Sequence, residues 1–333
     1  MEVFMEDKIT SPLAETTTLI RLTTKFWSGI KADKRLRVAL AEDVNATDNR
    51  SLHVAKHLVG NNANKYFRRI INGVRNDLYY PMTLAWDDNS YDDDGKVQSG
   101  WRLCPNSRID VLMEHLSIAK DNFFKEVDGF CKRYPLLIEE ARHQLGDAFN
   151  IEDYPDVEEI REKFKFDFEV NLLSSWNNYS TDIRTTASSS VVDRIVNDAK
   201  KREQKNVKSI LRDFIGGVVE QGEHIVEKLA TYDPKQKQKG GFFKNSSIDK
   251  FRQCVEMIPS VNSDILGNDK EIATAHQELV QVLAQINDID SLRDESEIGE
   301  SKRQNISTGI KDAIDPLKSS LFDKLKGGDN EST

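Results

Sequence analysis

The sequence predicts a mainly α protein, with a small antiparallel β element in its N-terminal half. Three observations predict this class. Charged residues make up 31% of the 333 residues and hydrophobic residues only 38%, a balance typical of long amphipathic helices. Apolar residues recur at helical spacing over most of the chain. One segment, KFKFDFEV, instead alternates apolar and charged residues with the period of two that is typical of a half-buried strand.

The first third of the chain predicts three helices and a hairpin. A Ser-Pro start and apolar residues on one face favour a helix over 12–30. A second helix is expected over 51–60, where a glycine ends it, and a third over 67–78, ahead of a proline. Segments 83–86 and 100–103 flank an acidic loop and predict the two arms of a hairpin.

A long helix and a strand follow the hairpin. Asn106 or Ser107 is expected to cap a helix that reaches Gly146, with Pro135 as either a kink or the start of its continuation. The alternating segment predicts a strand over 163–173. We expect this strand to pair with the hairpin, because an isolated hairpin is only marginally stable in water.

The second half of the chain predicts one very long amphipathic helix that is coiled-coil-like. Gly216, Gly217 and Gly222 weaken its interior and indicate a kink or a close helix crossing. Shorter helices are expected around the apolar stripes 272–286 and 306–325, the second with a restart at Pro316. The expected organisation is a helical head with the β element (1–174), the long helix (181–232), a flexible linker (233–247), C-terminal helices (248–326) and a disordered tail (327–333).

Charge is distributed unevenly along the acidic chain, whose pI is about 5.4. Residues 1–80 hold 13 Lys and Arg against 9 Asp and Glu, whereas residues 81–174 hold 11 against 21. The asymmetry indicates either that these segments pack on each other or that they present opposite faces to partners. Ordinary solvated helix surface is the alternative explanation.

The sequence lacks the common catalytic and cofactor motifs, so we expect a protein that is not an enzyme and holds no cofactor or metal. It has no phosphate-binding loop, no dinucleotide fingerprint and no H-E-x-x-H. Three distant cysteines form no C-x-x-C pair, which fits a reducing cytoplasm. His53 and His57 have a ligand-like spacing if both lie on one helix face, but no third ligand is near. The acidic loop 87–100 matches a calcium-binding loop poorly, because Ser90 takes the first ligand position and Trp101 stands where the last position requires a glutamate.

An acidic run after the long central helix is a candidate partner-binding surface, with plain solvation as the alternative. Nothing in the sequence indicates that its carboxylates are buried, which acid–base chemistry would require. The candidate residues are Asp147, Glu152, Asp153, Asp156, Glu158 and Glu159.

Two basic stretches are candidate nucleic-acid contacts, because lysines neutralise phosphates and aromatic rings stack on bases. The acidic pI argues against general nucleic-acid binding. The candidate residues are Lys200, Lys201, Arg202, Lys205 and Lys208 in the first stretch, and Phe242 and Phe243 in the second.

About half of the chain, residues 19–173, resembles the uncharacterised phage and prophage family filed as domain of unknown function 3150. The segments that carry the resemblance are LIRLTTKFWSG (19–29), AKHLVG (55–60), LYYPMTLAWDD (78–88), GWRLCPNS (100–107), RYPLLIEEARHQLGDAFNIEDYP (133–155) and KFKFDFEV (163–170). The family has no established catalytic residues. Such proteins often occur beside a MoxR-type AAA+ ATPase and a von Willebrand A-type protein, so the resemblance implies a phage protein that contacts one of these.

These observations predict a non-enzymatic protein that acts through protein–protein contact, as an adaptor or client of the ATPase system. An accessory factor of phage DNA metabolism, in recombination or single-strand binding, is the first alternative, and an anti-host factor is the second. The long helix favours homo-oligomers. No apolar run of membrane-spanning length and no signal peptide are recognised, so we expect no membrane contact and a cytoplasmic location, in the host if the protein is phage-encoded.

Overall fold

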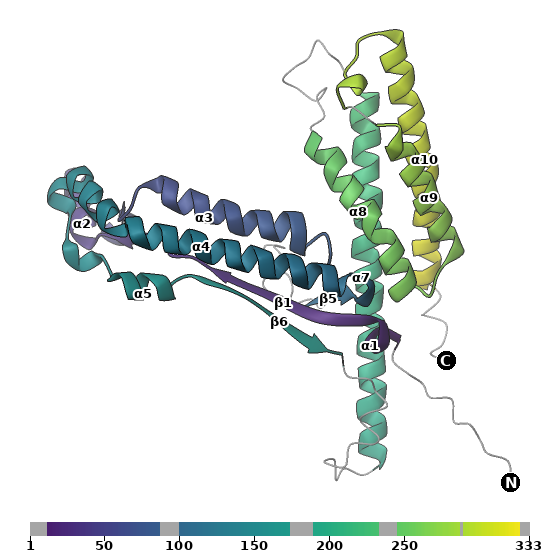
Figure 1. Ribbon diagram of the computed structural model, residues 1–333, viewed down its shortest axis with the longest axis horizontal. Helices are drawn as coiled ribbons and strands as arrows, with labels where there is room; N and C mark the ends of the chain where they lie inside the picture. The colour runs from purple at the N-terminus through teal and green to yellow at the C-terminus, as the bar shows by residue number, and fades with distance from the viewer. Residues whose placement is uncertain (1–11, 87–99, 174–188, 233–244, 287–288, 327–333) are drawn as a thin grey trace. The chain divides into compact units, whose positions relative to one another are not determined.

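The computed structural model is mainly helical, as predicted, and forms two compact units (Figure 1). It describes residues 12–86, 100–173, 189–232, 245–286 and 289–326. Unit 1 comprises Met1–Ile20, Pro81–Asp110 and Val170–Thr333, and unit 2 comprises Arg21–Tyr80 and Val111–Glu169. The predicted linker 233–247 and tail 327–333 lie largely outside the described residues.

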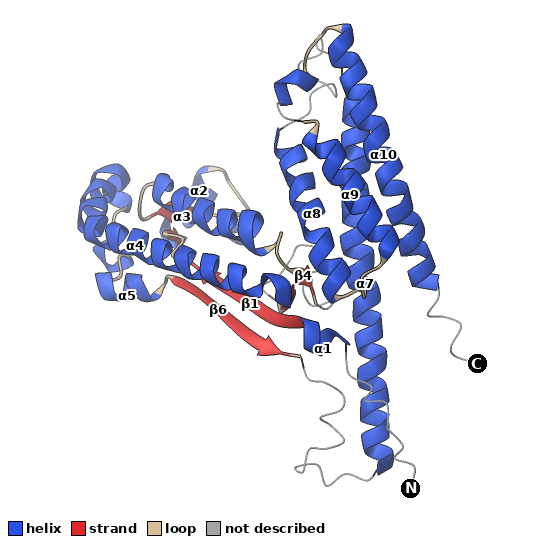
Figure 2. Ribbon diagram, turned by 45° about the vertical axis from the view of Figure 1, so that its right-hand side comes forward, coloured by secondary structure: helices blue, strands red, loops and turns tan. Residues whose placement is uncertain are grey.

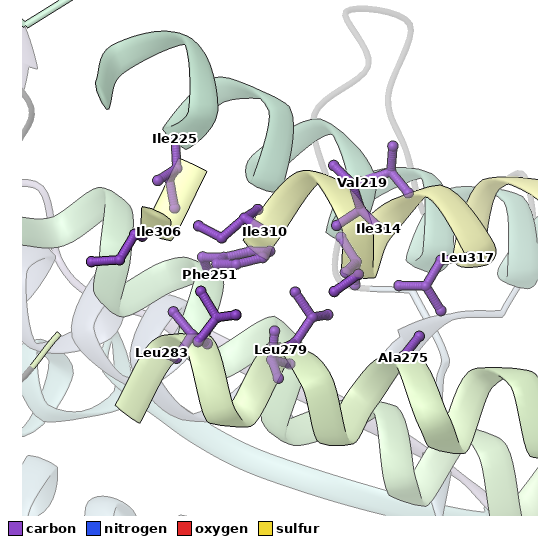
Figure 3. Packing of buried hydrophobic residues seen from close by; sticks show 14 of the residues in the cluster. Val219, Ile225, Phe251, Ala275, Leu279, Leu283, Ile306, Ile310, Ile314 and Leu317 are labelled. Atoms are coloured by element: carbon purple, nitrogen blue, oxygen red, sulfur yellow. The ribbon is translucent and has the colours of Figure 1, made fainter. Parts of the chain in front are cut away.

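Four helices surround one apolar core in unit 1 (Figures 1 and 2). They are α7 (Ser189–Ala230), α8 (Asn245–Asp264), α9 (Lys270–Ala284) and α10 (Glu297–Lys326). Each helix packs against two others, in the cyclic order α7, α8, α9, α10. Figure 3 shows side chains from all four helices converging around Phe251, which is fully buried. The core thus explains why apolar residues recur at helical spacing in this half of the sequence.

Two glycines let the helices of unit 1 approach closely. A Cβ atom on Gly222 would lie 3.1 Å from Cγ2 of Ile314, and one on Gly309 would lie 2.7 Å from Cγ2 of Val282. The close crossing predicted for Gly222 is therefore confirmed. The stretch of α7 before Ile210 has no fully buried side chain among its described residues and extends beyond α8, α9 and α10 (Figure 1).

A four-stranded sheet has the order β4–β5–β1–β6. Its strands are β1 (Thr17–Lys25), β4 (Leu84–Ala85), β5 (Arg102–Pro105) and β6 (Lys165–Leu172). The predicted hairpin is confirmed, since β4 and β5 pair antiparallel. The predicted pairing of the 163–173 strand with that hairpin is wrong, because β1 lies between β5 and β6. The error follows from expecting a helix where β1 runs.

The helix predicted over 12–30 is only the short α1 (Pro12–Thr16). The chain then enters β1, whose TTLIRLTTK sequence is rich in β-branched residues that favour strands. The helix predicted over 51–60 is also wrong, because a 3₁₀ turn (Asn49–Ser51) and the strand β3 (Ala55–His57) occupy that segment. Helix α2 (Lys34–Asp43) was not expected from the sequence.

Unit 2 has an aromatic core between α3 (Asn61–Gly73) and α4 (Asn106–Leu145), the latter entering from unit 1. Helix α4 passes through Pro135 without ending. The ring centroids of Phe67 and Phe164 are 4.7 Å apart, and Phe123 and Phe130 complete the cluster. A π-helical segment (Val74–Tyr79) continues α3, while 3₁₀ turns (Gly146–Ala148 and Ile151–Asp153) and α5 (Val157–Glu162) follow α4.

The three cysteines are all free thiols. Cys104 and Cys131 are buried, and Cys254 is half-buried. Burial raises the pKa of Cys104 to about 12 and also raises the pKa of the other two thiols. All three are therefore protonated at neutral pH.

Candidate protein-contact surface

A small module of unit 2, residues 30–57, is here called the α2 arm. Its strands β2 (Ile30–Ala32) and β3 pair antiparallel, with Lys31 opposite Lys56. Asp33 directly follows β2 and caps α2, because its carboxylate accepts hydrogen bonds from the backbone N–H groups of Arg35 (3.0 Å) and Leu36 (3.1 Å). The cap and the two strands thus fix where α2 begins.

A buried cluster of charges attaches the α2 arm to the segment after α4. Nζ of Lys56 lies 3.3 Å from Oδ2 of Asp33 and 2.5 Å from Oδ2 of Asp153, and donates to the carbonyl oxygen of Ala148 (2.9 Å). Nζ of Lys31 lies 2.7 Å from Oδ1 of Asp153. The side chains of Lys56 and Asp33 are only 6% exposed and that of Asp153 only 8%. Two strands and a 3₁₀ turn, distant in sequence, are therefore held together by ion pairs.

The pKa values of these groups follow from burial and charge. Hydrogen bonding, first from the Leu36 backbone N–H and then from Lys56, outweighs burial and lowers the pKa of Asp33. Burial acts to raise the pKa of Asp153, but Lys31 and Lys56 outweigh it and the pKa is lowered. Burial acts to lower the pKa of Lys56, yet the two carboxylates raise it. All three groups are therefore charged near neutral pH.

Helix α2 exposes its apolar residues. Leu36, Leu40 and Val44 are spaced by four residues along one face and are 41%, 41% and 53% exposed. Ile30 and Val38 are also exposed, at 46% and 40%. Leu36, Leu40 and Val44 are here called the α2 stripe, because Val38 lies two positions from Leu36 and Leu40 and therefore faces another side of the helix. A cluster of exposed large apolar side chains of this kind marks an interaction site more often than chance.

The charges of α2 oppose its own dipole. Lys34 and Arg35 occupy the first turn, whereas Glu42 and Asp43 occupy the last turn. A helix is stabilised by acids at its N-terminus and bases at its C-terminus, which is the reverse arrangement. Sequences that break such local rules often do so at functional sites. The charge order therefore adds a second indication that α2 is a contact element.

The six acidic residues predicted as a partner surface have different surroundings in the structure. Asp147, Glu152, Glu158 and Glu159 are exposed. Asp153 is buried in the ion-pair cluster. Asp156 caps α5, because its carboxylate accepts a hydrogen bond from the backbone N–H of Glu159 (2.8 Å).

The predicted nucleic-acid residues lie on the extended first half of α7 or outside the described residues. Lys201, Arg202 and Lys205 are exposed, and Lys200 and Lys208 are half-buried. Phe242 and Phe243 fall outside the described residues. The apolar seam of the second half of α7 packs on the other helices of unit 1.

The two sequence patterns considered as metal sites are the histidine pair and the acidic loop. His57 lies in β3 and His53 precedes it outside any helix, so the two do not share a helix face. Most of the acidic loop 87–100 lies outside the described residues. Among the described residues, no group of three or more His, Cys, Asp or Glu side chains is placed to hold a metal ion.

Unit 1 contains a polar cavity of about 520 Å³ between the end of α7 and the start of α10. Arg303 lines it, but its guanidinium already donates to the carbonyl oxygens of Leu292 (3.1 Å) and Asp294 (2.8 Å). It also lies 4.8 Å from the centre of the Tyr232 ring. These contacts already engage the guanidinium of Arg303. We therefore assign Arg303 a role in packing rather than in binding a ligand.

The sequence contained one readable signal for the α2 stripe. Asp33 followed by apolar residues at positions 36, 40 and 44 is a capped helix with one apolar face. The buried ion pairs around Lys56 had no such signal, because Lys31 and Asp153 are 122 positions apart in the sequence.

Comparison with known proteins adds no relative. No protein-family model, curated protein or solved structure matches the chain. Within the described residues, none of the helices has both the length and the apolar character needed to cross a membrane.

Proposed function

We propose that the protein acts through protein–protein contact, with α2 as its docking helix, as an adaptor or client of a MoxR-type AAA+ ATPase. The single observation that supports docking is the α2 stripe, which presents Leu36, Leu40 and Val44 to solvent. The proposed link to the ATPase depends on the family resemblance of residues 19–173. Protein partners commonly use such stripes by laying an amphipathic helix along them.

The charge order of α2 defines the chemistry of the partner. Lys34 and Arg35 at one end favour acids on the partner helix, and Glu42 and Asp43 at the other end favour bases. Neither Lys34 nor Arg35 has an ion pair within the described part of the chain, so both are available. The proposed occupant is therefore an amphipathic helix with an apolar face and opposite charges at its two ends.

The buried ion pairs support this role by fixing the arm in advance. A docking helix that is already ordered loses less conformational entropy when it binds. Lys56 and Asp153 keep α2 in one position, although α2 itself buries only Ala41. Buried ion pairs are better attested as devices of specificity than of stability, which fits such an anchor.

The test measures binding of the purified full-length protein to a purified MoxR-type ATPase by calorimetry. The variant Leu36→Ser/Leu40→Ser/Val44→Ser removes the apolar stripe. The matched control, Val191→Ser/Ile195→Ser, removes exposed apolar side chains from α7, which are 46% and 40% exposed. We expect at least a tenfold loss of affinity for the α2 variant and less than a twofold change for the control.

Three outcomes would contradict the proposal. If the α2 variant binds the ATPase as tightly as the unchanged protein, α2 is not the docking helix. If the unchanged protein does not bind, the ATPase is not its partner. If light scattering instead shows a dimer that the α2 variant abolishes, a second copy of the chain occupies the stripe.

A further inference from the structure

Helix α3 has a cationic face opposite to its buried face. Phe67 and Ile71 pack into the aromatic core and are 2% and 4% exposed. The opposite face carries exposed polar and cationic side chains at helical spacing. This surface, here called the α3 face, consists of Lys65, Arg68, Arg69, Asn72 and Asn76.

The α3 face borders a shallow depression of about 430 Å³. Gly73 also lines it and adds no side chain, while Asp77 at one end is the one acid of this described lining. The π-helical segment begins directly after Gly73 and carries Asn76 and Asp77.

The cations of the α3 face are not neutralised by the part of the chain that the structure describes. Lys65, Arg68 and Arg69 make no ion pair there. Arg75 is different, because its guanidinium donates to Oγ1 of Thr24 (2.7 Å). Cations left without carboxylate partners on an otherwise acidic protein favour an anionic ligand.

Charge within unit 2 is separated by segment. Residues 21–80, which include α3, hold 12 Lys and Arg against 5 Asp and Glu, whereas residues 111–169 hold 8 against 15. The segment that contains α3 therefore has an excess of cations even though the chain as a whole carries a net charge of −9.

The dimensions and chemistry of the α3 face match a phosphodiester chain. Residues 65 to 76 span about 16 Å at 1.5 Å per residue. A nucleic-acid strand places several phosphates over this length, and arginine forks donate two parallel hydrogen bonds to phosphate oxygens. Asparagine amides are common donors to phosphates and sugars. The face itself has no large apolar side chain, which a membrane-surface helix would insert between lipids.

We propose that the α3 face binds the phosphodiester backbone of a nucleic acid without reading its bases. This binding goes beyond the proposed function, because it uses α3 and a different ligand. It also differs from the nucleic-acid prediction from sequence, which placed the contact on Lys200–Lys208 and Phe242–Phe243.

Fluorescence anisotropy of labelled single strands and duplexes of about 20 nucleotides tests the proposal on the full-length protein. The variant Lys65→Gln/Arg68→Gln/Arg69→Gln removes three cations from the α3 face. The matched control, Lys201→Gln/Arg202→Gln/Lys205→Gln, removes three exposed cations from α7. We expect at least a tenfold loss of affinity at low salt for the α3 variant and less than a twofold change for the control.

Salt dependence provides an independent readout. Three phosphate contacts give a slope of log K against log salt of about −2 on single strands, so affinity should fall about 16-fold between 50 and 200 mM salt. The α3 variant should lose this slope. A second variant, Arg68→Lys/Arg69→Lys, keeps the charge but loses the forked donors, so it should keep the salt slope and bind more weakly than the unchanged protein. Circular dichroism spectra of both variants check that they are folded.

Several results would overturn the proposal. They are no binding at 50 mM salt, a larger loss for the α7 control than for the α3 variant, or affinity that does not change with salt. Tighter binding to vesicles that contain phosphatidylserine than to either oligonucleotide would assign the α3 face to a membrane surface instead.

Discussion

The four-helix core of unit 1 and the α2 arm of unit 2 use opposite rules for what they bury. The core buries apolar side chains such as Phe251 and Leu279, both fully enclosed. The arm buries Lys56 and Asp33 and exposes Leu36 and Leu40. The hydrophobic effect explains why the core forms, but it does not explain an arm that leaves apolar surface in water. The difference supports the proposal that α2 docks a partner.

The largest expected effect on stability is for a substitution in the core of unit 1. Phe251→Ala removes a fully buried ring and leaves a cavity, so we expect the free energy of unfolding of unit 1 to fall by about 4 kcal/mol. Urea unfolding followed by circular dichroism measures this loss. Val280→Ala, at a 46% exposed position of α9, is the control and should change stability by less than about 1 kcal/mol. Equal losses of unfolding free energy for both variants would contradict the conclusion that Phe251 lies in a tightly packed core.

The next prediction concerns the ion pairs of Lys56 that hold the α2 arm. Lys56→Met leaves Asp33 and Asp153 buried without their shared cation, at a cost of about 3 kcal/mol. Hydrogen exchange of peptides that span α2 should speed up by about 100-fold, while peptides of α9 should keep their protection. Glu152→Gln, an exposed neighbour, is the control. Unchanged exchange in α2 would show that the ion pairs do not hold the arm.

Acid should loosen the arm by the same mechanism. The pKa values of Asp33 and Asp153 lie below the ordinary value of 3.8 in the folded chain. Their stabilising effect is therefore complete at a pH well above 3.8 and is lost as the pH falls through the folded pKa values. Between the unfolded and folded pKa values, each of the two carboxylates lowers the free energy of unfolding by about 1.4 kcal/mol for every pH unit. The NMR signal of the Ala41 amide should shift below pH 4 in the unchanged protein. An Asp153→Asn variant that shows the same shift would exclude Asp153 as its source.

The smallest expected effect concerns the α2 stripe itself. Leu40→Ala should reduce the free energy of unfolding by less than about 1 kcal/mol, because the side chain is 41% exposed. The same change at Leu279, which is fully buried, should cost about 3 kcal/mol. Thermal unfolding of the two variants in parallel measures the contrast. A large loss for Leu40→Ala would show that the stripe is part of the fold rather than a contact surface.

The helical class, the hairpin and the strand 163–173 could be predicted because each has a local periodic pattern. Helix α3 was predictable for the same reason. The glycines inside the long helix indicated a kink or a close crossing, and the close approach is found at Gly222. Strand β1 was missed because its apolar residues also fit a helical face, and its pairing with β5 and β6 shows that the segment is a strand. Its many threonines were the signal that favoured a strand.

The candidate surfaces were less predictable than the fold. Asp153 looked like one more acid in an exposed run, and its burial depends on Lys31 and Lys56, about 100 positions away. No local pattern reports such a contact. The α3 face could have been read from the spacing of Lys65, Arg68 and Arg69, but whether nearby acids neutralise them depends on the tertiary structure.

The protected thiols make this chain a convenient host for site-directed labelling. Thiol reagents attack the thiolate, and burial raises the pKa of Cys104, Cys131 and Cys254. A single cysteine introduced on the exposed face of α2 or α3 would therefore react far faster than the three native ones. A fluorophore or crosslinker can then be placed on either surface without first removing any native cysteine.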